Sequence, residues 1–170
     1  MDKHSLNIAV LTVSDTRDEL SDRSGAFLCQ AIADAGHNNS DKCIVKDDIY
    51  AIRAVISKWI ADSQIHAIVI NGGTGFGSRD STPEAVSVLF DKQVEGFGEL
   101  FRAISFDEIG SSTIQSRAIA GFANHTVIFC LPGSTGACKT GWSNIIEQQL
   151  DSTHKPCNFV NHLMTGKGEH

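Results

Sequence analysis

The chain alternates short apolar runs with segments in which apolar residues recur every three or four positions. Residues 8–13, 67–70 and 126–131 form nearly continuous apolar runs, which is typical of strands buried on both faces of a sheet. A weaker strand is predicted over residues 37–46. Because strands buried in this way alternate with helical segments, the pattern predicts an α/β fold with a mainly parallel central sheet and helices on both faces.

Helical segments are expected between these runs. Residues 24–36 carry an apolar face and end at Gly36, a usual helix stop. Asp48 is placed to cap a helix that runs to about residue 63. The apolar stripe of that helix comprises Ile52, Val55, Ile56, Trp59 and Ile60. Further helices are expected over residues 83–90, 96–110, 116–122 and 137–150, with Leu100, Phe101 and Ile104 facing inward.

The length of the chain favours a single domain. A chain of 170 residues can build one proper core, whereas two domains would each be small. We therefore predict one domain over residues 1–170, with terminal extensions at about residues 1–6 and 152–170, because the tail after Asp151 shows no periodicity.

Charge and hydropathy exclude two classes of partner. The net charge of −6 leaves no basic stripe to neutralise a nucleic acid backbone. The apolar runs are too short to span a bilayer, and the first residues lack the pattern of a signal peptide. We expect no nucleic acid partner, no membrane association and a cytoplasmic location. The five cysteines form no CxxC pair, and the neighbouring His154, Cys157 and His162 have no recognisable metal-ligand spacing.

The most informative segment is NGGTGFGSRDSTPE, which follows the apolar run 67–70. The glycines at 72, 73, 75 and 77 let the backbone bend and approach a ligand closely. Behind them, Ser81 or Thr82 can cap a helix that has Pro83 in its first turn and Glu84 next to it. A strand, a glycine-rich loop and a helix N-terminus together favour an anion site, because unpaired N–H groups and the helix dipole act together.

Two interpretations of this segment are open. The spacing matches neither GxGxxG nor the GK[ST] of a P-loop, and glycines can simply relieve strain in a tight turn. Four glycines together with Thr74, Arg79 and Asp80 favour phosphate binding over that alternative. An acidic residue inside an anion site also suggests that the anion arrives with a metal ion.

Three strands end in loops of small or charged residues. These are Ser14 and Asp15 after the first strand, residues 71–80 after the third, and residues 132–136 after the last. In open parallel sheets, ligands bind at the carboxyl ends of the strands. The three loops together therefore predict one site for a small anionic ligand, with phosphate as the expected group.

The chain resembles the molybdenum cofactor biosynthesis protein B family, within the wider molybdopterin-binding domain. The stretches that carry the resemblance lie in order along nearly the whole chain: LTVSDTR at 11–17, VKDDIYAIRA at 45–54, NGGTG at 71–75, RDSTPEA at 79–85, EGFGELFR at 95–102 and LPGST at 131–135. The segments SFDEIG at 105–110 and KPCNF at 155–159 are closer to protein B than to the related adenylyltransferases. One departure is Asn71, where the glycine loop of this domain commonly begins with Thr.

The resemblance implies a three-layer α/β/α sandwich that assembles as a hexamer, or next as a trimer. It also implies binding of molybdopterin, a pterin with a dithiolene and a terminal phosphate. Active relatives transfer AMP from ATP to that phosphate and use Mg²⁺. Asp80 and Asp48 match the two acidic positions of that chemistry, so both are candidate catalytic residues and Mg²⁺ ligands.

The remaining candidates are ligand-binding residues around these two aspartates. They are Ser14, Asp15, Gly72, Gly73, Thr74, Gly75, Ser81, Thr82, Pro83, Glu84, Pro132, Gly133 and Ser134. Plainer alternatives stay open for several. Asp48 can be an N-cap alone, Asp80 can pair with Arg79 or cap near Pro83, and Ser14 and Asp15 can form an ordinary strand exit.

Two classes of function compete at this point. The first is a molybdopterin adenylyltransferase that uses ATP and Mg²⁺. The second is a protein of the same pathway that binds molybdopterin or its precursor without turnover. Other proteins of molybdenum cofactor biosynthesis are possible partners in either case.

Overall fold

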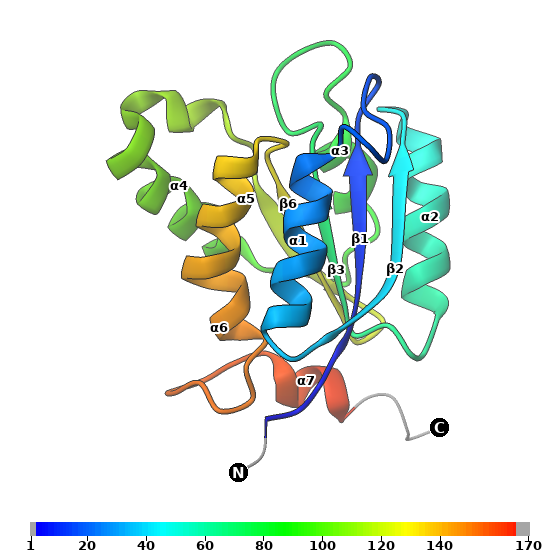
Figure 1. Ribbon diagram of the computed structural model, residues 1–170, viewed down its shortest axis with the longest axis vertical. Coiled ribbons are helices and arrows are strands. Elements are labelled where there is room, and N and C mark those ends of the chain that lie inside the picture. Colours follow the sequence, from blue (N-terminus) through cyan, green and yellow to red (C-terminus); the bar gives the residue numbers. More distant parts are fainter. Residues whose placement is uncertain (1–2, 166–170) are drawn as a thin grey trace.

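A single six-stranded sheet organises the chain in the computed structural model, which describes residues 3–165 (Figure 1). The strand order is β2-β1-β3-β6-β5-β4. The bounds are β1 Asn7–Val13, β2 Asn38–Val45, β3 Ala67–Asn71, β4 Lys92–Gln93, β5 Ile119–Ala123 and β6 Thr126–Leu131. The apolar runs that predicted buried strands correspond to β1, β3 and β6, and the weaker strand to β2.

The sheet is mainly parallel. Strand β1 pairs in parallel with β2 and β3, and β3 pairs in parallel with β6, so the carboxyl ends of these strands lie at one edge. Strands β5 and β4 add an antiparallel extension beside β6.

The prediction of a helix over residues 116–122 is wrong, because most of this segment forms β5. It pairs with β6 through a two-residue turn at Asn124 and His125, whose φ angles are 46° and 64°. Positive φ at both central residues matches the twist of a hairpin, and this turn usually contains glycine. Pairing with β6 makes this segment a strand, because so short a segment has little intrinsic preference for helix or strand.

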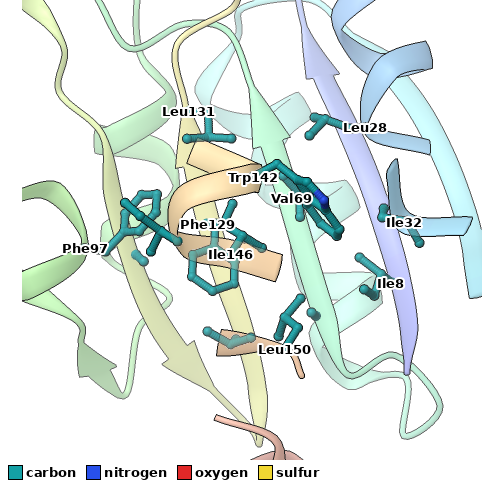
Figure 2. Packing of buried hydrophobic residues seen from close by; sticks show 14 of the residues in the cluster. Ile8, Leu28, Ile32, Val69, Phe97, Phe129, Leu131, Trp142, Ile146 and Leu150 are labelled. Atoms are coloured by element: carbon teal, nitrogen blue, oxygen red, sulfur yellow. The ribbon is translucent and has the colours of Figure 1, made fainter. Parts of the chain in front are cut away.

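Helices cover both faces of the sheet, as the three-layer prediction requires. Helices α2 (Ile49–Ala61) and α3 (Thr82–Ser87) pack on one face, against the side chains of Leu11, Ile68, Ile70 and Ile128. On the other face lie α1 (Arg23–Asp34), α4 (Glu95–Ile109), α5 (Thr135–Gly141), a π-helical turn (Trp142–Ile146), α6 (Glu147–Gln149) and α7 (Val160–Met164). Figure 2 shows this second core, in which Phe129 and Val69 of the sheet contact Trp142 and Ile146.

Helix α4 differs from its prediction in one residue. Phe101 is buried and Ile104 packs against the core, but the side chain of Leu100 is exposed, so its inward placement is wrong. A short 3₁₀ helix, Gly110–Gln115, follows α4.

The C-terminal segment contributes to the core. In α7, the side chains of Val160 and Leu163 are fully buried. Residues 1–2 and 166–170 of the predicted terminal extensions lie outside the described residues. Over residues 3–165, no helix combines the length and the apolar character that crossing a bilayer needs.

Candidate functional site

A cavity of about 510 Å³ lies where the loops after β3 and β6 meet α4. Its wall combines three parts of the chain. The glycine loop, residues 72–80, contributes Gly72, Gly73, Thr74, Gly75 and Asp80. The loop after β6 and the start of α5 contribute Pro132, Gly133, Ser134, Gly136 and Ala137. Helix α4 and the segment after it contribute Phe101, Ser105, Glu108, Ile109, Ser112, Gln115 and Ser116. Eight of the residues predicted from the sequence therefore line one cavity.

The glycine loop begins with a backbone that only glycine adopts easily. Gly72 has φ 96° and Gly73 has φ 69°. A Cβ atom on Gly72 would lie 2.1 Å from the carbonyl oxygen of Val13, which is a backbone atom at the end of β1. The Gly72 N–H donates to the Leu131 carbonyl at 3.0 Å, and the Thr82 hydroxyl donates to the Gly72 carbonyl at 2.8 Å. The first residue of the loop is thus fixed between β1, β6 and α3.

The next three residues have free backbone donors. The N–H groups of Gly73, Thr74 and Gly75 donate to no acceptor within residues 3–165. All three residues line the cavity. Consecutive unpaired amide groups of this kind form an anion-binding concavity.

Asp80 lies on the same wall of the cavity. Its Oδ2 accepts a hydrogen bond from the Gly77 N–H at 2.8 Å, whereas its Oδ1 accepts none within the described part of the chain. A Cβ atom on Gly75 would come within 2.9 Å of Oδ2, so Gly75 is needed for space beside this carboxylate and not for a positive φ. Arg79 does not pair with Asp80; it forms an ion pair with Asp15.

The loop after β6 closes the opposite side. Ser134 is the N-cap of α5, and its hydroxyl oxygen accepts a hydrogen bond from the Ala137 N–H at 3.1 Å. Gly133 approaches the glycine loop so closely that a Cβ atom on it would lie 3.2 Å from the Cα of Gly72. The Ser24 hydroxyl holds this loop by donating to the Gly133 carbonyl at 2.7 Å.

Asp48 is the N-cap of α2, as the sequence predicted. Its Oδ1 accepts hydrogen bonds from the N–H groups of Tyr50 at 3.0 Å and Ala51 at 2.8 Å. Asp48 is not part of the cavity wall. Its catalytic and metal-binding roles stay predictions, and the structure supplies a separate reason for an aspartate at this position.

The neighbouring Asp47 is a residue that the sequence analysis missed. Its carboxylate is buried and accepts hydrogen bonds from both the N–H and the hydroxyl of Ser81. Desolvation by burial raises the pKa of Asp47, and the hydrogen bonds from Ser81 oppose that shift. The doublet Asp47-Asp48 is the available signal in the sequence, but only Asp48 stands at the position of a helix cap.

Ser14 and Asp15 form a strand exit outside the cavity wall. The Ser14 hydroxyl oxygen accepts the N–H of Arg17 at 3.0 Å. Asp15 accepts two hydrogen bonds from Arg79, at 2.9 and 3.0 Å. This pairing lowers the pKa of Asp15 to about 2. The Asp15–Arg79 pair therefore connects the loop after β1 to the glycine loop.

The residues at the start of α3 support the glycine loop from behind. Ser81 is the N-cap of α3 by position, but its side chain bonds to Asp47 and caps no helix N–H. Thr82 and Pro83 are buried, and Glu84 forms an ion pair with Arg117. None of these four predicted binding residues, 81–84, lines the cavity.

The α4 side of the cavity was missed by the sequence analysis. Phe101, Ser105, Glu108 and Ser112 recur at helical spacing, which was the only signal for a shared face. Both carboxylate oxygens of Glu108 lie 2.9 Å from the Thr140 hydroxyl. The hydroxyl of Ser116 is buried and has no hydrogen-bond partner in the described residues. Buried polar groups are usually paired, so this hydroxyl is a candidate to bond to a ligand in the cavity.

Comparison with known proteins identifies the family. A family model described as "Probable molybdopterin binding domain" matches residues 9–152. Molybdenum cofactor biosynthesis protein B of Escherichia coli K12 is 56% identical over 156 residues, which cover 92% of each chain. The chain belongs to the molybdenum cofactor biosynthesis protein B family. The family member of Bacillus subtilis is 44% identical over 142 residues, or 83% of this chain and 84% of that protein.

The fold agrees with a solved member of this family. A crystal structure of a molybdenum cofactor biosynthesis protein B superimposes with a TM-score of 0.85 and 41% identity, covering 88% of this chain and 94% of the other. The family resemblance and the α/β fold predicted from the sequence are therefore both confirmed.

Proposed function

We propose that this protein acts in molybdenum cofactor biosynthesis by binding molybdopterin and transferring AMP from ATP to its terminal phosphate, with release of pyrophosphate. Family membership supports the pathway. The observation that carries the binding step is the row of unpaired N–H groups at Gly73, Thr74 and Gly75, which lines the 510 Å³ cavity beside Asp80. A cavity of this volume suits a pterin with a phosphate side chain.

The phosphate side of the cavity is the glycine loop. Free amide donors from a rigid backbone bind phosphate without the entropy loss of ordering long side chains. Ser134 and Gly136, across the cavity, place the start of α5 near the same ligand. In this arrangement the glycine loop holds the terminal phosphate of molybdopterin. The α4 side of the cavity, with Ser105 and Glu108, then contacts the pterin rings.

The residues present fit a Mg²⁺ ion that arrives with ATP. Mg²⁺ is commonly held by one or two carboxylates together with substrate phosphates and water. Over residues 3–165, no group of three or more acidic, histidine or cysteine side chains could hold a metal alone. Asp80, whose Oδ1 accepts no hydrogen bond from the described residues, is the carboxylate that would hold the ion. Bound there, Mg²⁺ would offset charge on the transferring phosphate.

A second function, binding of molybdopterin without transfer, is favoured by one observation. Asp48, one of the two acidic residues matched to the transfer chemistry, uses its Oδ1 as a helix cap and lies outside the cavity wall. If Asp48 acts only as a cap, the site keeps one of those two carboxylates. A binding protein needs neither.

The test is incubation of the protein with ATP, Mg²⁺ and molybdopterin, followed by chromatography for adenylylated molybdopterin. Omission of each component in turn provides the controls. Formation of the product only when all three are present supports the transferase. Saturable binding of molybdopterin without product supports the binding function instead.

We also propose that the protein assembles as a hexamer, with a trimer as the next choice, and acts in the cytoplasm. The large side chains of Leu100, Phe106, Ile109 and Ile114 are exposed along α4 and the 3₁₀ helix that follows it. A contact between copies would remove this apolar surface from water. The five cysteines are free thiols, which suits a reducing compartment. Light scattering should give a mass near six or three chains, and a stable, active monomer would contradict the assembly.

A further inference from the structure

Arg117, which lies just before β5, contacts the glycine loop through both its backbone and its side chain. Its Nε donates to the Gly75 carbonyl at 3.0 Å, and its Nη2 donates to the Gly75 carbonyl at 2.7 Å and to the Asp80 carbonyl at 3.1 Å. Its backbone N–H donates to the Thr74 carbonyl at 3.2 Å. One residue therefore holds three carbonyl groups of segment 74–80.

The guanidinium group is itself fixed on two sides. Its Nη1 forms an ion pair with Glu84 of α3. Its Cζ lies 5.2 Å from the centre of the Phe76 ring, which is a cation–π contact. Phe76 is 70% exposed, so burial in the core does not hold it in place. The side chain of Arg117 thus connects α3, the loop and the start of β5.

Segment 74–80 has few other contacts with the body of the protein. The hydrogen bonds between Gly77 and Asp80 are internal to the segment. Apart from Arg117, the hydrogen bonds that join segment 74–80 to other parts of the described chain are those between the Arg79 side chain and Asp15, which are exposed. An exposed ion pair contributes little to stability.

We propose that Arg117 is a positioning residue, which fixes segment 74–80 so that the free N–H groups of the glycine loop and the Asp80 carboxylate face one bound ligand. Arg117 does not line the cavity, so it acts through the loop and not by contact with the ligand. This role rests on the proposed function, because it concerns the binding of molybdopterin at the same loop. It assigns a role to Arg117, which lies outside the glycine loop, in the connection between the 3₁₀ helix and β5.

The chemistry of the contact requires arginine in particular. A planar guanidinium donates to two carbonyl groups and stacks on an aromatic ring at the same time. The single ammonium group of lysine carries the same charge but cannot reproduce this geometry. Arg117→Lys should therefore keep the attraction to Glu84 and lose the fixed position of the loop.

Arg53 provides a matched control. Its Nε donates to the Ala85 carbonyl at 3.0 Å, its Nη2 donates to the Glu84 carbonyl at 3.1 Å, and its Cζ lies 5.6 Å from the centre of the Tyr50 ring. Like Arg117, it donates to two carbonyl groups and lies over an aromatic ring, but the carbonyl groups belong to α3 and not to the glycine loop. Arg53→Ala therefore controls for the loss of these contacts, and the ion pair with Glu84 is an additional contact of Arg117.

The experiment measures three properties of Arg117→Ala, Arg117→Lys and Arg53→Ala: hydrogen exchange over residues 72–81, affinity for molybdopterin by calorimetry, and thermal midpoint. For Arg117→Ala we expect faster exchange in this segment and affinity reduced about tenfold or more, because three charge-assisted hydrogen bonds to the loop are lost. Millimolar guanidinium ion should restore part of that affinity. Arg53→Ala should change neither the exchange nor the affinity, even if its thermal midpoint falls equally.

Several results would overturn the proposal. Unchanged exchange in Arg117→Ala would show that the loop is fixed by other contacts, and unchanged affinity with faster exchange would show that its position is not needed. If Arg117→Ala does not fold, Arg117→Lys decides between the same outcomes. If the unaltered protein binds no molybdopterin, the proposed function fails, and exchange alone then tests whether Arg117 fixes the loop.

Discussion

Replacement of Gly72 by alanine would test whether the start of the glycine loop has the backbone conformation described above. An alanine at φ 96° is strained, and its Cβ would lie 2.1 Å from the Val13 carbonyl oxygen. Because a backbone atom cannot rotate away, either the end of β1 or the loop must move. Backbone strain of this kind costs about 1–3 kcal/mol, and the clash adds to it.

The expected loss for Gly72→Ala is about 3 kcal/mol in the free energy of unfolding. For a chain of this size that corresponds to a fall of about 6–12 °C in thermal midpoint. Displacement of the loop should also weaken molybdopterin binding about tenfold or more, since the free N–H groups of Gly73 and Thr74 shift with it. Differential scanning calorimetry and isothermal titration calorimetry measure the two effects.

Gly96→Ala is the matched control. Gly96 lies in the first turn of α4, where a Cβ atom would meet nothing within 4 Å. This change should leave the thermal midpoint unchanged or raise it slightly, because alanine favours the helix by about 0.5–1 kcal/mol. A Gly72→Ala protein as stable as Gly96→Ala would refute the close approach of the loop to β1, and equal affinity would refute its role in binding.

Four other substitutions, at three positions, separate the roles of individual residues. Asp48→Ala should lower the thermal midpoint by about 2–4 °C through loss of the helix cap, whereas Asp48→Asn should keep the thermal midpoint and reduce only adenylyl transfer. Full activity in Asp48→Asn would show that Asp48 acts as a helix cap alone. Gly75→Val should weaken molybdopterin binding in calorimetry by displacing Asp80, and unchanged affinity would place the loop outside the site. Arg79→Gln should raise the pKa of Asp15 from about 2 towards 3.8 in an NMR titration, and an unchanged pKa would exclude Arg79 as the cause. In the unaltered protein the stabilisation from Asp15 is present above pH 3.8 and is lost as the pH falls towards 2; in Arg79→Gln most of it should be absent at any pH.

The sequence predicted the parts of the fold that depend on long, regular apolar patterns. Strands β1, β3 and β6 are continuous apolar runs, and α2 combines an apolar stripe with a clear cap at Asp48. Strand β5 could not be predicted in this way. It is held by pairing with β6 across the turn at Asn124 and His125, a tertiary contact that leaves no periodicity within the strand.

The candidate site was predicted where its residues are consecutive and missed where they are distant in sequence. Several glycines close together in the sequence indicate a flexible backbone that can approach a ligand, so Gly72 to Gly75 could be predicted as part of the site. Glu108 lines the cavity from α4, and Arg117 contacts the glycine loop from just before β5. An isolated glutamate or arginine carries no local signal of such a contact. Exposure of Leu100 likewise depends on how α4 is rotated against the sheet, which the spacing alone did not determine.

The proposed transfer of AMP is tested most directly by measuring the reaction for the unaltered protein and for Asp80→Asn. The substitution is nearly isosteric and removes the charge of a carboxylate that lines the cavity. We expect adenylylated molybdopterin from the unaltered protein with ATP and Mg²⁺, and loss of most turnover in Asp80→Asn with the fold and most molybdopterin binding retained. An unaltered protein that binds molybdopterin but forms no adenylylated product would contradict the proposed transfer.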